Sequence, residues 1–285
     1  MNQPHLFVDI SAHGFGHLAQ AAPVINALAA QLPTMRVTIR SGLPQAKLHE
    51  RLRCAFSHLA ARSDFGYVML DAMRVDLAAT AQAYRRQHAE WEQLVDREAC
   101  FLAGLQPTLV LSDVAYLPLA GAARAGIPSV ALCSLNWAEL FAHFFGAADW
   151  APRIHQQMLA AYDDAEFFLR LTPGMPMADL ARRRCIGPVA DIGADRRQVL
   201  HQQLACDPDE RLVLIAFGGI DTQLPVAEWP QPTGVRWLVP QGWRLRQANT
   251  SDFEPLELPM IDLLCSVDAV IAKPGYGTFA EAACN

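Results

Sequence analysis

The 285-residue sequence lacks the features that identify several large classes of protein. Its only basic cluster is Arg182-Arg183-Arg184, which we interpret as a solvated linker face, and its net charge is −6, so we expect no nucleic-acid partner. No apolar run is long enough to cross a membrane, because polar residues interrupt the most hydrophobic region, 130–145. The first residues have neither the charged nor the long apolar region of a signal peptide.

Cysteine is present, but not in a pattern that binds metal or forms a disulfide framework. The seven cysteines are odd in number, none are in Cys-x-x-Cys spacing, and several lie within apolar runs, where they act as small hydrophobic side chains. We therefore expect a reduced, cytoplasmic protein. The motif His-Glu-x-x-His is also absent, and no partner at zinc spacing follows the first histidines, so we predict no metal.

Apolar segments of strand length alternate with segments of helical periodicity, which is typical of α/β proteins with parallel, doubly wound sheets. The hydrophobic content of 52% supports cores of ordinary size. In the first part of the chain we expect strands at 6–10, 35–40, 66–70, 108–112, 129–133 and 166–170. We expect helices at 17–32, 44–53, 75–105, 115–125 and 150–163.

A second α/β unit is expected after a region rich in proline and glycine at 172–188. The expected elements there are a helix at 195–205 and strands at 212–217, 235–239 and 268–272. We predict an N-terminal Rossmann-like domain at 1–175, a linker at 176–195 and a C-terminal Rossmann-like domain at 196–285. Because the sequence ends soon after the last strand, we expect this second domain to be incomplete.

The first strand runs into the glycine turn 11–17, which carries two histidines and leads into a helix. The turn is not the dinucleotide fingerprint, because it has only Gly14 and Gly16. His17 and His13 lie where ligands bind in open parallel sheets, at the carboxyl end of a strand. A histidine there can take a proton from a hydroxyl at neutral pH. The alternative is that each histidine only hydrogen-bonds the loop.

Asp113 is the candidate partner of that histidine. It stands at the carboxyl end of the strand expected at 108–112, where its carboxylate can orient and stabilise a histidine as the third member of a catalytic triad does. The alternative is that Asp113 caps the helix expected to begin near Val114. The two roles are compatible.

The end of the sequence repeats the order of strand, glycine turn and helix. The apolar strand at 268–272 is followed by a lysine and a turn whose amides and helix dipole suit a diphosphate, with an acidic residue one turn later that suits a ribose. These donor-binding candidates are Lys273, Gly275, Tyr276, Gly277, Thr278 and Glu281, and Gly218 and Gly219 form a further glycine turn. The alternative is a capping box, Thr278-x-x-Glu281, that binds nothing.

Five segments resemble nucleotide-sugar-dependent glycosyltransferases of the GT-B fold, which have two Rossmann-like domains facing across a cleft. The similarity is greatest to the glycosyltransferase-like N-terminal region of L-arabinokinase-type proteins. It covers nearly the whole chain and is carried by 14–17, 111–114, 125–130, 217–219 and 273–278, of which the first and last are the most specific.

The resemblance implies an inverting glycosyltransferase that uses a nucleoside-diphosphate sugar as co-substrate and no other cofactor. His17 or His13 occupies the position of the base, and Asp113 that of its partner. The stretch from Gly275 to Glu281 has the spacing of the donor-binding stretch, and we also place Gly14, Gly16, Gly218 and Gly219 on the donor side. Lys273 replaces the histidine of the plant-type enzymes, which leaves the identity of the donor open.

Three alternatives to a transferase remain open from the sequence. The chain could bind a sugar nucleotide without turnover, epimerise a sugar nucleotide with no acceptor present, or bind a partner protein and no nucleotide. The acceptor is unknown. Weaker candidates for acceptor contacts follow expected strands: Arg74, Asp76, Asn136, Trp137 and Glu139.

Overall fold

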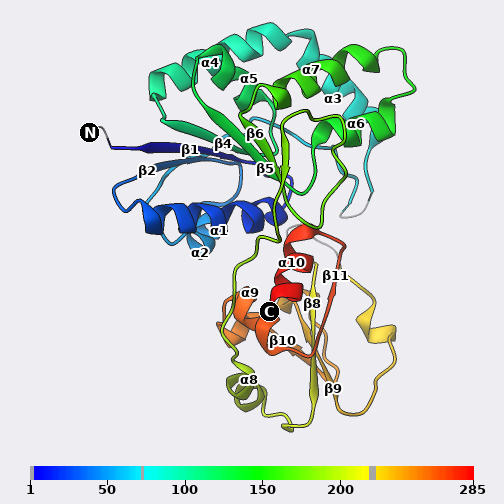
Figure 1. Ribbon diagram of the computed structural model, residues 1–285. Helices are drawn as coiled ribbons and strands as arrows, with labels where there is room; N and C mark the ends of the chain where they lie inside the picture. Colours follow the sequence, from blue (N-terminus) through cyan, green and yellow to red (C-terminus); the bar gives the residue numbers. More distant parts are fainter. Residues whose placement is uncertain (1–2, 72–73, 218–222) are drawn as a thin grey trace. The chain divides into compact units, whose positions relative to one another are not determined.

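The computed structural model describes residues 3–71, 74–217 and 223–285. The chain divides into two compact units, Met1–Val189 and Ala190–Asn285, each built on its own parallel sheet (Figure 1). The predicted α/β architecture is confirmed in both units. The division falls within the range 176–195 that we expected to connect two domains.

The first unit contains a sheet of seven parallel strands in the order β3-β2-β1-β4-β5-β6-β7. Helices α1 and α2 cover one face, and α4 and α5 lie on the other (Figure 1). Buried apolar residues such as Phe7, Val110 and Leu132 fill the strands, as expected where both faces are covered. The strands are β1 (His5–Ile10), β2 (Arg36–Arg40), β3 (Ser57–Leu59), β4 (Leu109–Asp113), β5 (Ser129–Cys133), β6 (Phe167–Arg170) and β7 (Arg183–Cys185).

Among the described residues, seven helices of this unit connect the strands and cover the sheet. Two of them begin at capping side chains: Asp76 accepts a hydrogen bond from the amide of Ala79, and Asn136 accepts one from the amide of Glu139. The helices are α1 (Phe15–Gln31), α2 (Gln45–Arg51), α3 (Leu77–Ala89), α4 (Trp91–Leu105), α5 (Leu117–Arg124), α6 (Trp137–Phe145) and α7 (Ala151–Asp163).

The strand order creates a topological switch point between β1 and β4. From β1 the chain continues to β2 on one side, and it later returns to β4 on the other side. The two strands are in register so that Ile10 pairs with Asp113 at their carboxyl ends. Loops diverge at such a point and leave a crevice, which is the usual ligand site of an open α/β sheet.

Three sequence predictions in this unit are wrong in detail. Residues 66–70 form no strand; the third strand is β3, and the backbone of Val68 is satisfied by the Thr80 hydroxyl and the amide of Asp76. The helix expected at 75–105 is two helices, separated at Glu90. The basic cluster is not a linker face, because Arg183 and Arg184 belong to the edge strand β7, paired with β6.

The second unit contains a four-stranded parallel sheet in the order β10-β9-β8-β11. Its core gathers leucines from strands and helices, including Leu200, Leu214, Leu238 and Leu263. The elements are α8 (Arg197–Leu204), β8 (Arg211–Ala216), η1 (Val226–Glu228), β9 (Val235–Val239), η2 (Gln241–Trp243), β10 (Thr250–Asp252), η3 (Glu254–Leu256), α9 (Met260–Ser266), β11 (Ala269–Ala272) and α10 (Tyr276–Cys284). Within the described ranges no helix has the length and apolarity to cross a membrane.

Candidate functional site

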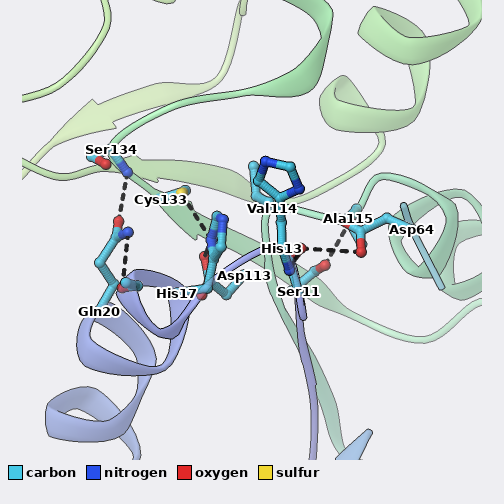
Figure 2. A network of polar contacts seen from close by, with 12 residues as sticks. Ser11, His13, His17, Gln20, Asp64, Asp113, Val114, Ala115, Cys133 and Ser134 are labelled. Carbon is cyan, nitrogen blue, oxygen red and sulfur yellow. Dashed lines mark hydrogen bonds and ion pairs between the residues drawn. The ribbon is translucent and has the colours of Figure 1, made fainter. Parts of the chain in front are cut away.

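The switch point of the first sheet brings together His17 and Asp113. Nδ1 of His17, in the first turn of α1, lies 3.2 Å from Oδ1 of Asp113, the last residue of β4 (Figure 2). Both side chains are buried, with 7% and 0% of their surface exposed. The structure thus pairs Asp113 with His17, and Asp113 does not cap a helix, since α5 begins at Leu117 with no side-chain cap.

The protonation of His17 is controlled by this carboxylate. Burial alone would lower the pKa of His17, but the charge of Asp113 and its hydrogen bond raise the pKa above the ordinary value, with a smaller contribution from Asp64. Because Nδ1 donates its hydrogen to Asp113, the lone pair of neutral His17 is on Nε2. The pair therefore provides a base at Nε2 whose protonated form is stabilised from behind.

The backbone next to Asp113 is strained. Val114 has a φ of 81°, which β-branched residues rarely adopt. Two buried hydrogen bonds hold this conformation: the Tyr162 hydroxyl donates to the carbonyl of Val114 at 2.7 Å, and the Ser112 hydroxyl donates to the carbonyl of Ala115 at 2.6 Å. Strain of this kind is concentrated at functional sites, where surrounding structure maintains it.

Gln20 fixes the start of α1 against the neighbouring strand. Its amide nitrogen donates to the carbonyl of Gly16 at 3.2 Å, and its oxygen accepts from the amide of Ser134, just beyond β5, at 2.9 Å (Figure 2). Gly16 is inside the first turn of α1, and Gly14 is the N-cap residue, with no side-chain cap at this helix end. The first turns of α1, which carry His17, are thus tied to β4 through Asp113 and to the end of β5 through Gln20.

His13 lies in an aromatic environment beside the pair. Its ring packs edge-on against Trp137, with ring centroids 5.4 Å apart, and its backbone amide donates to the Ser11 hydroxyl at 3.3 Å. Gly66 has a φ of +59°, and a Cβ there would lie 2.8 Å from Nδ1 of His13. Glycine is needed at position 66 both for this backbone conformation and for the close approach of the histidine.

Asp64 is a residue of the site that sequence reasoning missed. Its Oδ1 accepts a hydrogen bond from the Ser11 hydroxyl at 3.1 Å, and its Oδ2 accepts one from Nε1 of Trp137 at 2.8 Å. Burial and the negative charge of Asp9 raise its pKa to about 6. The sequence around Asp64 does not indicate a functional residue, because the segment that follows it, 66–70, has the composition of an ordinary apolar strand.

Cys133 completes the surroundings of the pair. In the part of the chain that the structure describes, His17, Asp113 and Cys133 are the one group of candidate metal ligands, with their ligand atoms within 4.8 Å of one another. Burial raises the pKa of the Cys133 thiol well above its ordinary value, so the protonated thiol, a poor metal ligand, is favoured. That the site works without a metal stays a prediction.

On the second unit, Lys273 follows β11 and precedes α10. The lysine is half-buried, desolvation lowers its pKa, and its ammonium has no hydrogen-bond or ion-pair partner among residues 3–71, 74–217 and 223–285. No side chain caps α10, whose N-cap is Gly275. A helix start with no side-chain cap, beside a lysine with no partner in the described part of the chain, suits an anion.

The remaining donor-binding candidates lie in α10 or outside the described residues. Tyr276, Gly277 and Thr278 form the first turn of α10, so Thr278 is inside the helix and the capping box is excluded. Glu281 lies one turn further and is buried, with 3% exposed. Gly218 and Gly219 follow β8, the neighbour of β11, but lie outside the described residues.

Comparison with known proteins agrees with these features. No family model matches the chain. L-arabinokinase from Arabidopsis thaliana is 27% identical over 289 residues, which cover 96% of this chain and 26% of that protein. The chain therefore spans about a quarter of the length of this curated relative.

Solved structures establish the fold. The calicheamicin glycosyltransferase has a TM-score of 0.62 at 16% identity, and a UDP-glucosyltransferase from Polygonum tinctorium has 0.60 at 15%; each match covers 99% of this chain and 78% of the other. A protein from Listeria monocytogenes that is named as a UDP-N-acetylglucosamine 2-epimerase has a TM-score of 0.53 at 12% identity. This match covers 97% of this chain and 76% of the other. The chain therefore shares the GT-B fold of these glycosyltransferases, which confirms the fold expected from its sequence.

Proposed function

We propose that the protein transfers a sugar from a nucleoside-diphosphate sugar to an acceptor hydroxyl, with inversion at the anomeric carbon. The observation that carries the proposal is the buried His17–Asp113 pair at the switch point of a GT-B fold. Structural neighbours that are named as glycosyltransferases, and a sequence relative that is named as L-arabinokinase, support an enzymatic role.

In the proposed reaction, Nε2 of His17 removes the proton of the acceptor hydroxyl while the oxygen attacks the anomeric carbon. The bond between that carbon and the diphosphate oxygen breaks, and the nucleoside diphosphate leaves with the electron pair. Asp113 stabilises the imidazolium that forms, as the acid of a triad does.

Most of the donor contacts are assigned to the second unit, and Gly14 and Gly16 of the first unit remain candidates for the donor side. The ammonium of Lys273 and the first amides of α10 neutralise the diphosphate, and Glu281 accepts hydrogen bonds from the ribose. Gly218 and Gly219 are donor-side candidates from the sequence alone, because they lie outside the described residues. The unpaired state of Lys273 among the described residues supports this assignment.

The proposal is tested with a thermal-shift panel of nucleoside diphosphates and their sugars, followed by product analysis with mixed acceptor hydroxyls. A donor that binds the native protein raises its melting temperature by mass action. Stabilisation by a sugar nucleotide and release of nucleoside diphosphate only with acceptor are expected. Absence of any nucleotide-induced shift would refute the assignment.

An epimerase is the second candidate, since one structural neighbour with this fold is named as a sugar-nucleotide 2-epimerase. An epimerase converts the sugar nucleotide with no acceptor present. Incubation with donor alone, followed by separation of the sugar nucleotides, distinguishes the two reactions.

A further inference from the structure

The carboxylate of Asp64 connects three segments that are distant in sequence. Asp64 itself lies between β3 and α3, Ser11 follows β1, and Trp137 begins α6. Each of its oxygens accepts one hydrogen bond, at 3.1 Å from Ser11 and at 2.8 Å from Trp137. Figure 2 shows Asp64 reaching toward Ser11 beside the turn that carries His13.

Both partners of Asp64 contact the histidines. Ser11 accepts the hydrogen bond of the His13 amide, and the indole of Trp137 lies 5.4 Å from the ring of His13 and 5.9 Å from the ring of His17. Removing the carboxylate would release one end of the histidine turn and the aromatic side chain on which both histidines pack.

Electrostatics adds a second effect. The charge of Asp64 raises the pKa of His17, and reciprocally the charge of His17 lowers the pKa of Asp64. Neighbouring buried tyrosines remain neutral at physiological pH, because burial raises their pKa values. The titratable groups that interact electrostatically with Asp64 or contact His17 are Asp9, Asp113, Cys133, Tyr84, Tyr116 and Tyr162.

We propose that Asp64 is a second acidic residue of the site: a positioning residue whose carboxylate links Ser11 of the histidine turn to Trp137, on which both histidines pack. The catalytic meaning of the His17 imidazolium rests on the proposed function. The coupling between Asp64 and His17 does not, and it is measurable without turnover.

The structure makes it possible to test whether position 64 needs an acid or only a hydrogen-bond acceptor. An asparagine at position 64 keeps the size of the side chain and an oxygen to accept from Trp137. A clamp alone would work with asparagine and would avoid placing a carboxylate near Asp9. The Asp64→Asn variant therefore separates the charge of the residue from its shape.

The experiment is an NMR titration of the histidine rings in the whole chain, with the His17 signals assigned by their loss in His17→Gln. In Asp64→Asn the pKa of His17 should fall. The matched control is Asp96→Asn, an exposed acid paired with Arg124 far from the site, which should leave the pKa of His17 unchanged. An unchanged pKa in Asp64→Asn would overturn the proposal.

A reciprocal measurement covers the case in which Asp64→Asn does not fold. Because coupling between two sites acts equally in both directions, His17→Gln should raise the pKa of Asp64, followed through its carboxyl carbon, above the value of about 6 in the parent. No rise in that variant would also refute the proposal. Should sugar transfer prove absent while both shifts occur, the proposed function fails and the role of Asp64 in His17 protonation stands.

Discussion

Ile10 and Asp113 are register partners across β1 and β4, and this pairing places the end of one strand beside the turn that carries His17. The 3.2 Å contact between His17 and Asp113 follows from that register, because both residues stand at the same carboxyl edge of the sheet. A shift of one residue would turn Asp113 to the other face of the sheet. The fold and the candidate chemistry are thus linked by one strand pair.

Replacing Asp113 by asparagine should reduce turnover strongly. The variant keeps the shape of the side chain but loses the charge that stabilises the imidazolium, and its NH2 group can donate to Nδ1 and favour the other tautomer. General-base catalysis of this kind contributes roughly 10²- to 10⁴-fold. Steady-state kinetics should show the loss in kcat, with the Kd for the donor unchanged. A variant with parent kcat would show that the carboxylate has no part in the reaction.

The pH dependence of turnover should report His17. The base works in its neutral form, and the pKa of His17 is raised above its ordinary value of 6.5, so kcat/KM should rise with pH through a pKa above 6.5. In Asp113→Asn the remaining activity should have its acidic limb at lower pH, because the charge that favours the imidazolium is gone. An acidic limb that does not move between the two proteins contradicts this origin.

Lys273 should matter for donor binding and not for acceptor activation. Lys273→Ala removes the half-buried cation from the start of α10, and we expect the Kd for nucleoside diphosphates to rise about tenfold, equivalent to roughly 1.4 kcal/mol. The sequence provides a matched control, since Lys47 is the other lysine and is exposed and paired with Glu50. Calorimetric titration of both variants checks the prediction, and equal affinities would contradict it.

Gly66→Ala should damage the site through its shape. The added Cβ would lie within 3.0 Å of both His13 and Trp137, at a backbone conformation that alanine adopts with strain of about 1–2 kcal/mol. We expect a lower melting temperature and a changed chemical shift of the His13 ring. Gly126→Ala is the control, since it has a similar positive φ of +68° but open space around it, so only the backbone cost should appear.

Much of this arrangement was predictable from local sequence. The period of apolar residues gave β1, β4 and β11, and glycine turns after strands located His17 and Lys273, because parallel strands all present their carboxyl ends to one edge. Asp113 was found by the same rule. Asp113 ends β4, Lys273 follows β11 directly, and His17 lies in the first turn of the helix after β1, so in each case the strand located the residue.

Other parts depend on tertiary contacts that local sequence does not encode. The segment 66–70 has the composition of a strand, yet Tyr67 is buried in an aromatic cluster and Val68 bonds to a side chain. Asp64 joins the site through hydrogen bonds with Ser11 and Trp137, which are 53 and 73 residues away. Short edge strands such as β3 and β7 carry too few apolar residues to give a periodic signal.

The most direct test of the account is a comparison of His17→Ala with the parent protein on a donor identified by the thermal-shift panel. We predict that donor binding, measured by the Kd, is retained and that transfer to the acceptor is lost. Parent-level transfer by His17→Ala would contradict the central claim that this histidine is the base.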